Sequence, residues 1–138
     1  MPPGWTLPAV EDVNREWFTS GTLAVQTCAS CGVLQHPPEE ICPACGAMSF
    51  VTTTVPGEGT VHSFTVVHHP VHQALEDAVP YTVVLVSLDA APELRVVGNL
   101  LGAPGVEVAI GMPVEAVWSE RASGDEETVL LPQWQRRT

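Results

Sequence analysis

The second half of the chain has the hydrophobic pattern of short β-strands. The segment 81–88 (YTVVLVSL) is rich in β-branched residues and is followed by the turn sequence Asp89-Ala90-Ala91-Pro92. Similar segments, separated by glycine- or proline-containing turns, bring the expected strands to five; the others are 61–69, 94–101, 113–120 and 127–131. Gly98, inside one of them, predicts a bulge or a bend. Five short strands with such turns are typical of a closed or nearly closed β-barrel.

The first 21 residues predict a short amphipathic helix instead. Its hydrophobic positions lie between Pro8 and Gly21, at spacings that place them on one side of a helix. They are Val10, Val13, Trp17 and Phe18. The simplest role of this side is to pack against the rest of the chain, although two large aromatic rings could instead form a docking surface. The segment 71–79 is long for a hairpin connection and predicts a helical turn or a functional loop.

All four cysteines lie within eighteen residues, in the sequences Cys28-Ala-Ser-Cys31-Gly and Cys42-Pro-Ala-Cys45-Gly. Two residues between paired cysteines let both thiolates point at one ion, and the glycine after each pair lets backbone amides approach the sulfurs. The pattern predicts a structural tetrathiolate site for zinc, with iron as the alternative because rubredoxin uses the same paired knuckles. Four thiolates leave no open position for substrate or water.

Other interpretations of the cysteines are less consistent with the sequence. Two disulfides are disfavoured because nothing indicates an oxidising compartment. Redox catalysis by one CxxC pair is disfavoured because the pair occurs twice and lacks a βαβ setting. His36 could replace a cysteine as a ligand, but four thiolates already complete the set. We therefore expect His36 at the surface, in the turn His36-Pro37-Pro38.

The charge of the chain limits its partners. Sixteen acidic residues face five basic ones, all arginines, and the formal net charge is −11. Nucleic acids and anionic membranes are therefore disfavoured, because binding to them depends on cations. No hydrophobic run is long enough to cross a bilayer, and the N-terminus lacks the features of a signal peptide. A cytoplasmic protein is expected, and the chain could be a piece of a longer natural one.

Several motifs follow one another in an order that characterises a known family. They are Glu16-Trp17-Phe18 before Gly21, both CxxCG knuckles, Pro38 between them, Gly57-Glu58-Gly59-Thr60-Val61, Ser63-Phe64-Thr65-Val66-Val67, Pro80-Tyr81, Gly98-Asn99-Leu100 and Ile110-Gly111-Met112-Pro113-Val114. Over nearly its whole length the chain resembles OB-fold proteins with an N-terminal rubredoxin-like zinc ribbon. The resemblance implies a mainly β fold with a helical segment over 1–22, a zinc ribbon over 23–54 and a five-stranded OB-fold barrel over 55–138.

The resemblance also implies a function. Members of this family look like companions of thiolase-superfamily aldolases or thiolases that act on acyl-CoA, including CoA thioesters of the steroid side chain. The expected role is a non-catalytic accessory subunit, with acyl-CoA at the shared interface. An alternative is the acyl-binding partner of a MaoC-like enoyl-CoA hydratase. Only the four cysteines transfer from the family with a role, as metal ligands, and no catalytic residues transfer.

Two further hypotheses belong to other classes. An OB barrel can bind single-stranded nucleic acid, but it does so with a basic groove that this chain cannot supply. A stand-alone zinc enzyme is disfavoured because the four thiolates saturate the metal.

The histidines and the single tyrosine are candidates for contacts with a ligand or a partner. His68 and His69 have no carboxylate at metal-ligand spacing, and Pro70 separates them from His72. We therefore expect exposed or pocket-lining histidines rather than catalytic ones. The hydroxyl of Tyr81 can bond a ligand carbonyl, or it can anchor the end of the barrel to the backbone.

The carboxyl end places Trp134 beside Arg136 and Arg137 in an otherwise acidic chain. Tryptophan and arginine are frequent in binding hot spots, so the segment is a candidate partner contact. Alternatively, Trp134 covers the barrel while the arginines are solvated. Together with Arg95, the two terminal arginines are also candidates for contacts to a CoA phosphate.

Overall fold

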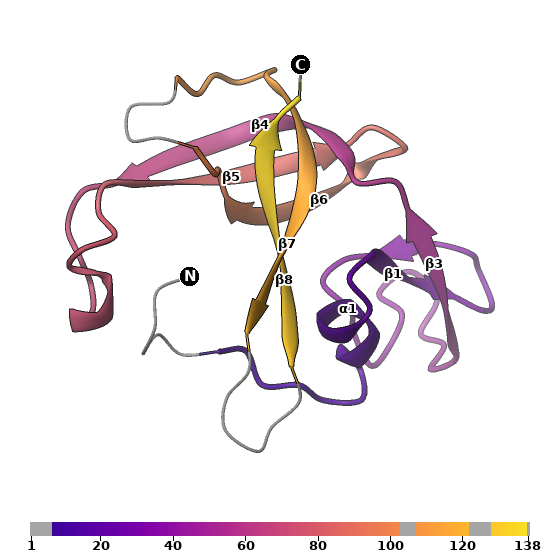
Figure 1. Ribbon diagram of the computed structural model, residues 1–138. Coiled ribbons are helices and arrows are strands. Elements are labelled where there is room, and N and C mark those ends of the chain that lie inside the picture. Colours follow the sequence, from indigo (N-terminus) through magenta and orange to yellow (C-terminus); the bar gives the residue numbers. More distant parts are fainter. Residues whose placement is uncertain (1–6, 103–106, 122–127, 138) are drawn as a thin grey trace.

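A small three-stranded sheet and a larger five-stranded sheet follow each other directly along the chain, and a short helix contacts both of them (Figure 1). The computed structural model describes residues 7–102, 107–121 and 128–137. The elements are α1 (Arg15–Thr19), β1 (Leu23–Cys28), β2 (Leu34–Gln35), β3 (Phe50–Val55), β4 (Glu58–Val67), the 3-10 turn η1 (Gln73–Leu75), β5 (Tyr81–Leu88), β6 (Ala91–Asn99), β7 (Pro113–Arg121) and β8 (Val129–Arg136).

The smaller sheet carries the cysteine ribbon. Its strand order is β2-β1-β3, and both pairings are antiparallel. β1 pairs with β3 along its whole length, from Leu23 opposite Val55 to Cys28 opposite Phe50. Because β1 ends at the first metal-ligand candidate, this pairing fixes where the ribbon presents Cys28.

The larger sheet has the order β6-β5-β4-β7-β8 with antiparallel neighbours. In β5 the alternate residues Val84, Val86 and Leu88 are fully buried, as the period of a strand with one face toward a core requires. The sheet nearly closes on itself where Leu100 forms a parallel bridge with Trp134, and Leu101 N–H donates to the Trp134 carbonyl at 2.7 Å. The predicted mainly β fold with a five-stranded barrel is thereby confirmed.

Bends in the barrel occur at two irregularities of register. One lies between Val61 and Ser63 of β4, and the other between Ser87 and Leu88 of β5. Gly98, for which the sequence predicts a bulge or bend, instead pairs regularly with Val84. The glycine lets β6 lie close to β8, because a Cβ at Gly98 would be 2.9 Å from Trp134 Cδ1 and 2.9 Å from the Pro132 carbonyl oxygen.

The helix is shorter than the sequence predicts, because the hydrophobic spacing from Pro8 onward continues through a turn rather than a helix. α1 begins at Arg15, and the Asn14 side chain accepts a 2.8 Å hydrogen bond from Glu11 N–H in the preceding turn. Gly21, at φ +68°, follows the end of the helix. Among the described residues, no helix has the length and hydrophobicity needed to span a membrane.

One hydrophobic core joins the two sheets. Trp17 of α1 and Leu23, Val25 and Val55 of the ribbon belong to the same buried cluster as the barrel residues. The barrel contributes Val61, Val84, Val86, Leu88, Ala91, Leu94, Val96, Met112, Val114 and Trp134. The ribbon is therefore fixed to the barrel by packing as well as by the chain.

Candidate metal centre

The four cysteines lie on two loops that repeat the same backbone geometry. In the first, Gly32 N–H donates to the Cys28 carbonyl at 2.9 Å, and in the second Gly46 N–H donates to the Cys42 carbonyl at 2.8 Å. The two glycines have φ of +76° and +77°, and a Cβ at either would meet nothing within 4 Å. Glycine is therefore required by the left-handed backbone and not by lack of space.

The sulfurs of Cys28, Cys31, Cys42 and Cys45 all lie within 4.8 Å of one another and form no disulfide. Cys28 Sγ is 3.6 Å from Cys45 Sγ, and Cys31 Sγ is 3.7 Å from Cys42 Sγ. A tetrahedral ion with metal–sulfur bonds of about 2.3 Å places its sulfurs about 3.8 Å apart. The donor set and its spacing therefore fit a tetrathiolate metal site.

The electrostatics of the four thiols also favour a cation among them. Cys31 N–H donates to Cys28 Sγ at 3.4 Å, and this hydrogen bond above all lowers the pKa of Cys28 to about 6. The Ala47 amide lowers the pKa of Cys45, but the neighbouring Cys28, lost hydration and the other two thiols outweigh it and raise that pKa to about 12. Thiolates this close repel one another, so a bound cation would make four of them compatible.

His36 does not join the cysteines. Its ring packs against Trp17 with centroids 4.1 Å apart, and the side chain is half-buried rather than at the surface as expected. Burial disfavours the imidazolium and lowers the pKa of His36 to about 4. No pattern in the sequence indicates this contact, because Trp17 and His36 come from different elements.

The other histidines form no second metal site. His68 and His69 are exposed beyond the end of β4. His72 Nδ1 accepts a 2.9 Å hydrogen bond from Ala74 N–H and so caps η1. Among residues 7–102, 107–121 and 128–137, the four cysteines are the one group of three or more potential ligands that comes together.

Tyr81 and Arg95 lie on neighbouring strands of the barrel. Tyr81 is half-buried at the start of β5, opposite Val67 of β4. Arg95 is exposed on β6, opposite Ser87, and makes no ion pair with any residue that the structure describes. Their roles as ligand contacts stay predictions.

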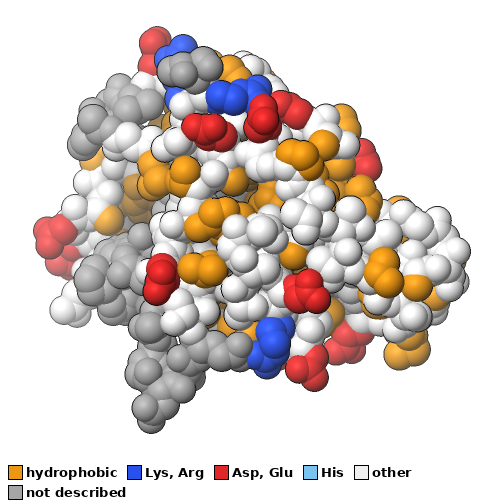
Figure 2. Space-filling view, turned by 45° about the vertical axis from the view of Figure 1, so that its right-hand side comes forward, with side chains coloured by type: hydrophobic (Ala, Val, Ile, Leu, Met, Phe, Trp, Pro, Cys, Tyr) orange, Lys and Arg blue, Asp and Glu red, His pale blue; other side chains and the backbone are white. Residues whose placement is uncertain are grey.

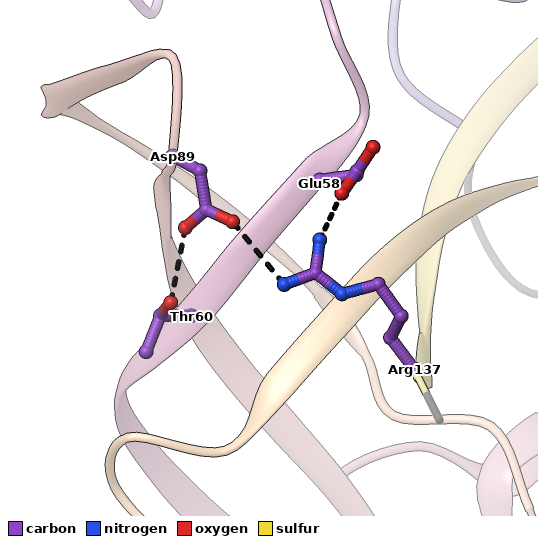
Figure 3. A network of polar contacts seen from close by, with 4 residues as sticks. All are labelled: Glu58, Thr60, Asp89 and Arg137. Atoms are coloured by element: carbon purple, nitrogen blue, oxygen red, sulfur yellow. Dashed lines mark hydrogen bonds and ion pairs between the residues drawn. The ribbon is translucent and has the colours of Figure 1, made fainter.

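The three C-terminal candidates have different surroundings. Trp134 is fully buried inside the barrel, in agreement with the alternative that it covers the barrel, and in this arrangement it has no surface for a partner. Arg136 is exposed. Figure 3 shows that the guanidinium of Arg137 instead lies across β4, where it pairs with Glu58 and with Asp89, the latter at 3.3 Å. Asp89 also accepts a 3.0 Å hydrogen bond from Thr60.

A hydrophobic groove of about 780 Å³ lies between the helix, the Pro37-Pro38 turn and the outer face of the barrel. Its residues include Trp17, Phe18 and Val97, with Arg95 as its cation. None of the described residues that line it is an aspartate or a glutamate, although the chain has sixteen acidic residues. Sequence reasoning missed this groove because its walls come from segments far apart in the chain. On the face shown in Figure 2, hydrophobic side chains gather in the middle, whereas carboxylates are spread around them.

The fold and the cysteine site together define a class of protein: a rubredoxin-like metal ribbon followed by an OB-type barrel. Residues 19–51 match the family described as the ChsH2 rubredoxin-like zinc ribbon domain, and residues 52–119 match the ChsH2 C-terminal OB-fold domain. The chain belongs to this ChsH2 family, so the resemblance seen in the sequence is confirmed.

Solved structures share the fold. One chain from the structure titled "Ltp2-ChsH2(DUF35) aldolase" is 38% identical, with a TM-score of 0.77 over 94% of this chain and 98% of that one. A DUF35-family protein of unknown function from Sulfolobus solfataricus is 16% identical and superimposes with a TM-score of 0.54 over 88% of this chain and 84% of that chain.

The curated relatives carry several names. A probable enoyl-CoA hydratase alpha subunit of Thermomonospora curvata is 41% identical over 82% of this chain. A 3-oxo-4,17-pregnadiene-20-carboxyl-CoA hydratase alpha subunit of Mycobacterium tuberculosis is 36% identical over 70% of this chain. The chain spans only 35% and 29% of these two relatives. A DUF35 domain-containing scaffold protein of Methanocaldococcus jannaschii is 32% identical over 72% of this chain and 70% of its own length.

Proposed function

We propose that the protein is a non-catalytic accessory subunit that binds and supports a thiolase-superfamily aldolase or thiolase acting on acyl-CoA, with CoA thioesters of the steroid side chain as one substrate class. The observation that carries the proposal is the similarity to a chain of an aldolase structure over almost the full length of both chains. The arrangement of the four thiols supports it, because a saturated metal stabilises a fold but leaves no position for a reacting group.

Zinc is the metal that we propose for the four cysteines. Support comes from the four-sulfur donor set, from the sulfur spacing and from the family description, which names a zinc ribbon. In this role the ion would hold the two knuckle loops together and keep the ribbon folded against the barrel.

We further propose that the hydrophobic groove beside Arg95 receives part of the acyl-CoA at the interface with the enzyme. Its residues Phe18 and Val97 offer apolar surface to an acyl chain, and Val97 is 59% exposed. A phosphate or carboxylate would be repelled by most of this acidic surface, but the described part of the groove has no carboxylate and has Arg95 at its wall. Arg137 is less suited to the same task, because Glu58 and Asp89 already neutralise its charge.

Pairing with a MaoC-like enoyl-CoA hydratase is the second candidate. The names of two relatives favour it, since both are hydratase alpha subunits in which a region resembling this chain makes up about a third of the length. In that case the protein would act as an acyl-binding domain or subunit of the hydratase.

Co-expression with a thiolase-like protein and with a MaoC-like protein from the same organism tests the proposal. We expect a stable complex with the thiolase-like protein and cleavage or thiolysis of CoA thioesters that neither chain performs alone. A complex and hydration activity with the MaoC-like protein alone would favour the second candidate. A protein that elutes as an unchanged monomer in the presence of both would contradict both.

A further inference from the structure

A second groove lies on the ribbon side of the helix, and its charged lining side chains are acidic rather than basic. We call it the ribbon groove. It has a volume of about 510 Å³ and lies between α1, the 38–40 segment and strands β1 and β3. Its hydrophobic surface includes Met48, which is 72% exposed, and Val51, which is 56% exposed. Large exposed hydrophobic side chains that line a groove are typical of a protein interaction site.

Four carboxylates surround this hydrophobic surface: Asp12, Glu16, Glu39 and Glu40. All four side chains are exposed, and no arginine or lysine is among the groove's described lining residues. Asp12 lies 3.9 Å from Arg15, whereas the three glutamates form no ion pair with a described residue. On the lower part of the face in Figure 2, several carboxylates lie beside a single cation.

The acidic side of the groove is held in place by a side chain of the ribbon sheet. Gln26 of β1 donates from Nε2 to the Glu39 carbonyl at 2.6 Å and accepts from Glu39 N–H at 3.0 Å. This pair of hydrogen bonds fixes the backbone at Glu39 against the strand. The carboxylates at 39 and 40 therefore start from an ordered backbone, which lowers the entropy lost when a partner binds.

The two grooves share Val13, Trp17 and Pro38 as a common wall. Among their described lining residues, one groove has no carboxylate, and the other has four carboxylates and neither lysine nor arginine. An anionic acyl-CoA would be repelled from the ribbon groove, as would nucleic acid and anionic lipid. A small cation would leave Met48 and Val51 exposed to water. The complementary ligand is a protein segment with both positive charge and hydrophobic side chains.

We infer that the ribbon groove docks a basic, amphipathic segment of a partner protein, in which hydrophobic side chains contact Met48 and Val51 and flanking lysines or arginines pair with Glu16, Glu39 and Glu40. This inference rests on the proposed function, because it assigns to the companion enzyme the segment that binds here. It separates the roles of the two grooves: the ribbon groove recognises the enzyme, and the groove beside Arg95 faces the acyl-CoA.

The first test measures the dissociation constant of the complex with the thiolase-like protein. The triple variant Glu16→Gln, Glu39→Gln, Glu40→Gln removes three charges and keeps the shape of the groove. The matched control Glu76→Gln, Asp77→Asn, Glu93→Gln removes three exposed charges outside both grooves. At low salt we expect about tenfold weaker binding for the groove variant and less than about twofold for the control. Equal weakening by the two variants would overturn the inference.

The second test does not need the enzyme. A short synthetic peptide of leucines and lysines is titrated into the isotope-labelled protein, and amide shifts are followed by NMR. Shifts centred on Gln26, Met48 and Val51 that are lost in the groove variant would support the inference, whereas shifts spread over the acidic surface would contradict it. If the peptide binds in the ribbon groove but the protein forms no complex with the enzyme, only the proposed function is contradicted. If the complex forms and the groove variant does not weaken it, only the inference is contradicted.

Discussion

The rings of Trp17 and His36 lie against each other, with centroids 4.1 Å apart and planes inclined by 34°. Trp17 comes from α1 and is 6% exposed, whereas His36 opens the proline turn of the ribbon. The contact joins the N-terminal helix to the ribbon and forms part of the wall of the groove beside Arg95. It also places a titratable ring where its charged form would lose hydration.

The stability of the protein should fall as the pH drops below the ordinary pKa of histidine. His36 has a pKa near 6.5 when unfolded and about 4 in the fold, so between these values the unfolded chain binds more protons. The stability that neutral His36 maintains is complete above about pH 6.5 and is lost as pH falls toward the folded value. From about pH 7.5 to pH 5 we expect a loss of about 2 kcal/mol, measured by urea unfolding.

The control for this prediction is His36→Phe, which keeps an aromatic ring against Trp17 and cannot titrate. Acid also weakens metal binding by cysteines, so the informative quantity is the difference between wild type and variant at each pH. Parallel stability profiles for the two proteins would contradict the assignment of this pH dependence to His36.

Removing one sulfur should release the metal and unfold the ribbon. Cys45→Ser deletes one of four ligands, and we expect the affinity for zinc to fall by more than about 100-fold, because metal binding in such sites contributes about 10 kcal/mol or more to folding. Ser30→Ala changes an exposed residue between two of the ligands and serves as the control. Metal content and amide spectra report the result. A variant that keeps its metal and its ribbon spectrum would show that four sulfurs are not required.

A methyl group at position 98 should destabilise the barrel closure. In Gly98→Ala the new Cβ would lie 2.9 Å from both Trp134 Cδ1 and the Pro132 carbonyl oxygen, so a buried indole and a backbone must move. Overpacking of this kind costs about 1–3 kcal/mol. Chemical denaturation measures the loss. A change within about 0.5 kcal/mol would mean that β6 and β8 can separate at little cost.

The charge network at the C-terminus should contribute modestly and in a salt-dependent way. Arg137→Gln removes the cation that pairs with Glu58 and Asp89, while Arg136→Gln removes an exposed neighbour without an ion pair in the described structure. Because the pairs are partly exposed, we expect about 0.5–1 kcal/mol lost for Arg137→Gln at low salt and almost nothing for Arg136→Gln. Thermal unfolding at two salt concentrations checks this. Equal effects of both substitutions would point to net charge as the cause.

Features set by local sequence were predictable. The predicted strand over 81–88 coincides with β5, because a segment rich in β-branched residues between two turns strongly favours a strand. The cysteine spacing predicted a shared site, because two residues between paired cysteines let both thiolates point at one ion. β8 was harder: the prediction ended at 131, yet the strand continues to Arg136 through Pro132. The proline is tolerated because β8 is the last strand in the order of the sheet and pairs along its length with β7.

Features that depend on contacts between distant segments were not predictable. Arg137 and Glu58 are 79 positions apart, and only the closure of the barrel brings them together. Sequence reasoning treated Arg137 as a free cation for that reason. The grooves on the two sides of α1 were missed for the same cause, since each combines the helix, the ribbon and, in one case, the outer face of the barrel.

The two knuckles are alike in a further respect: each contributes one buried sulfur, on Cys28 and Cys42, and one exposed cysteine, Cys31 and Cys45. An ion held by these four cysteines would be covered by protein on the side of Cys28 and Cys42, and solvent could reach it on the side of Cys31 and Cys45. Chelators would therefore reach the ion from the solvent side, where competing metals and oxidants would meet the sulfurs of Cys31 and Cys45 first. The inner pair would remain anchored beside the core, so replacement of the ion need not begin with melting of the barrel.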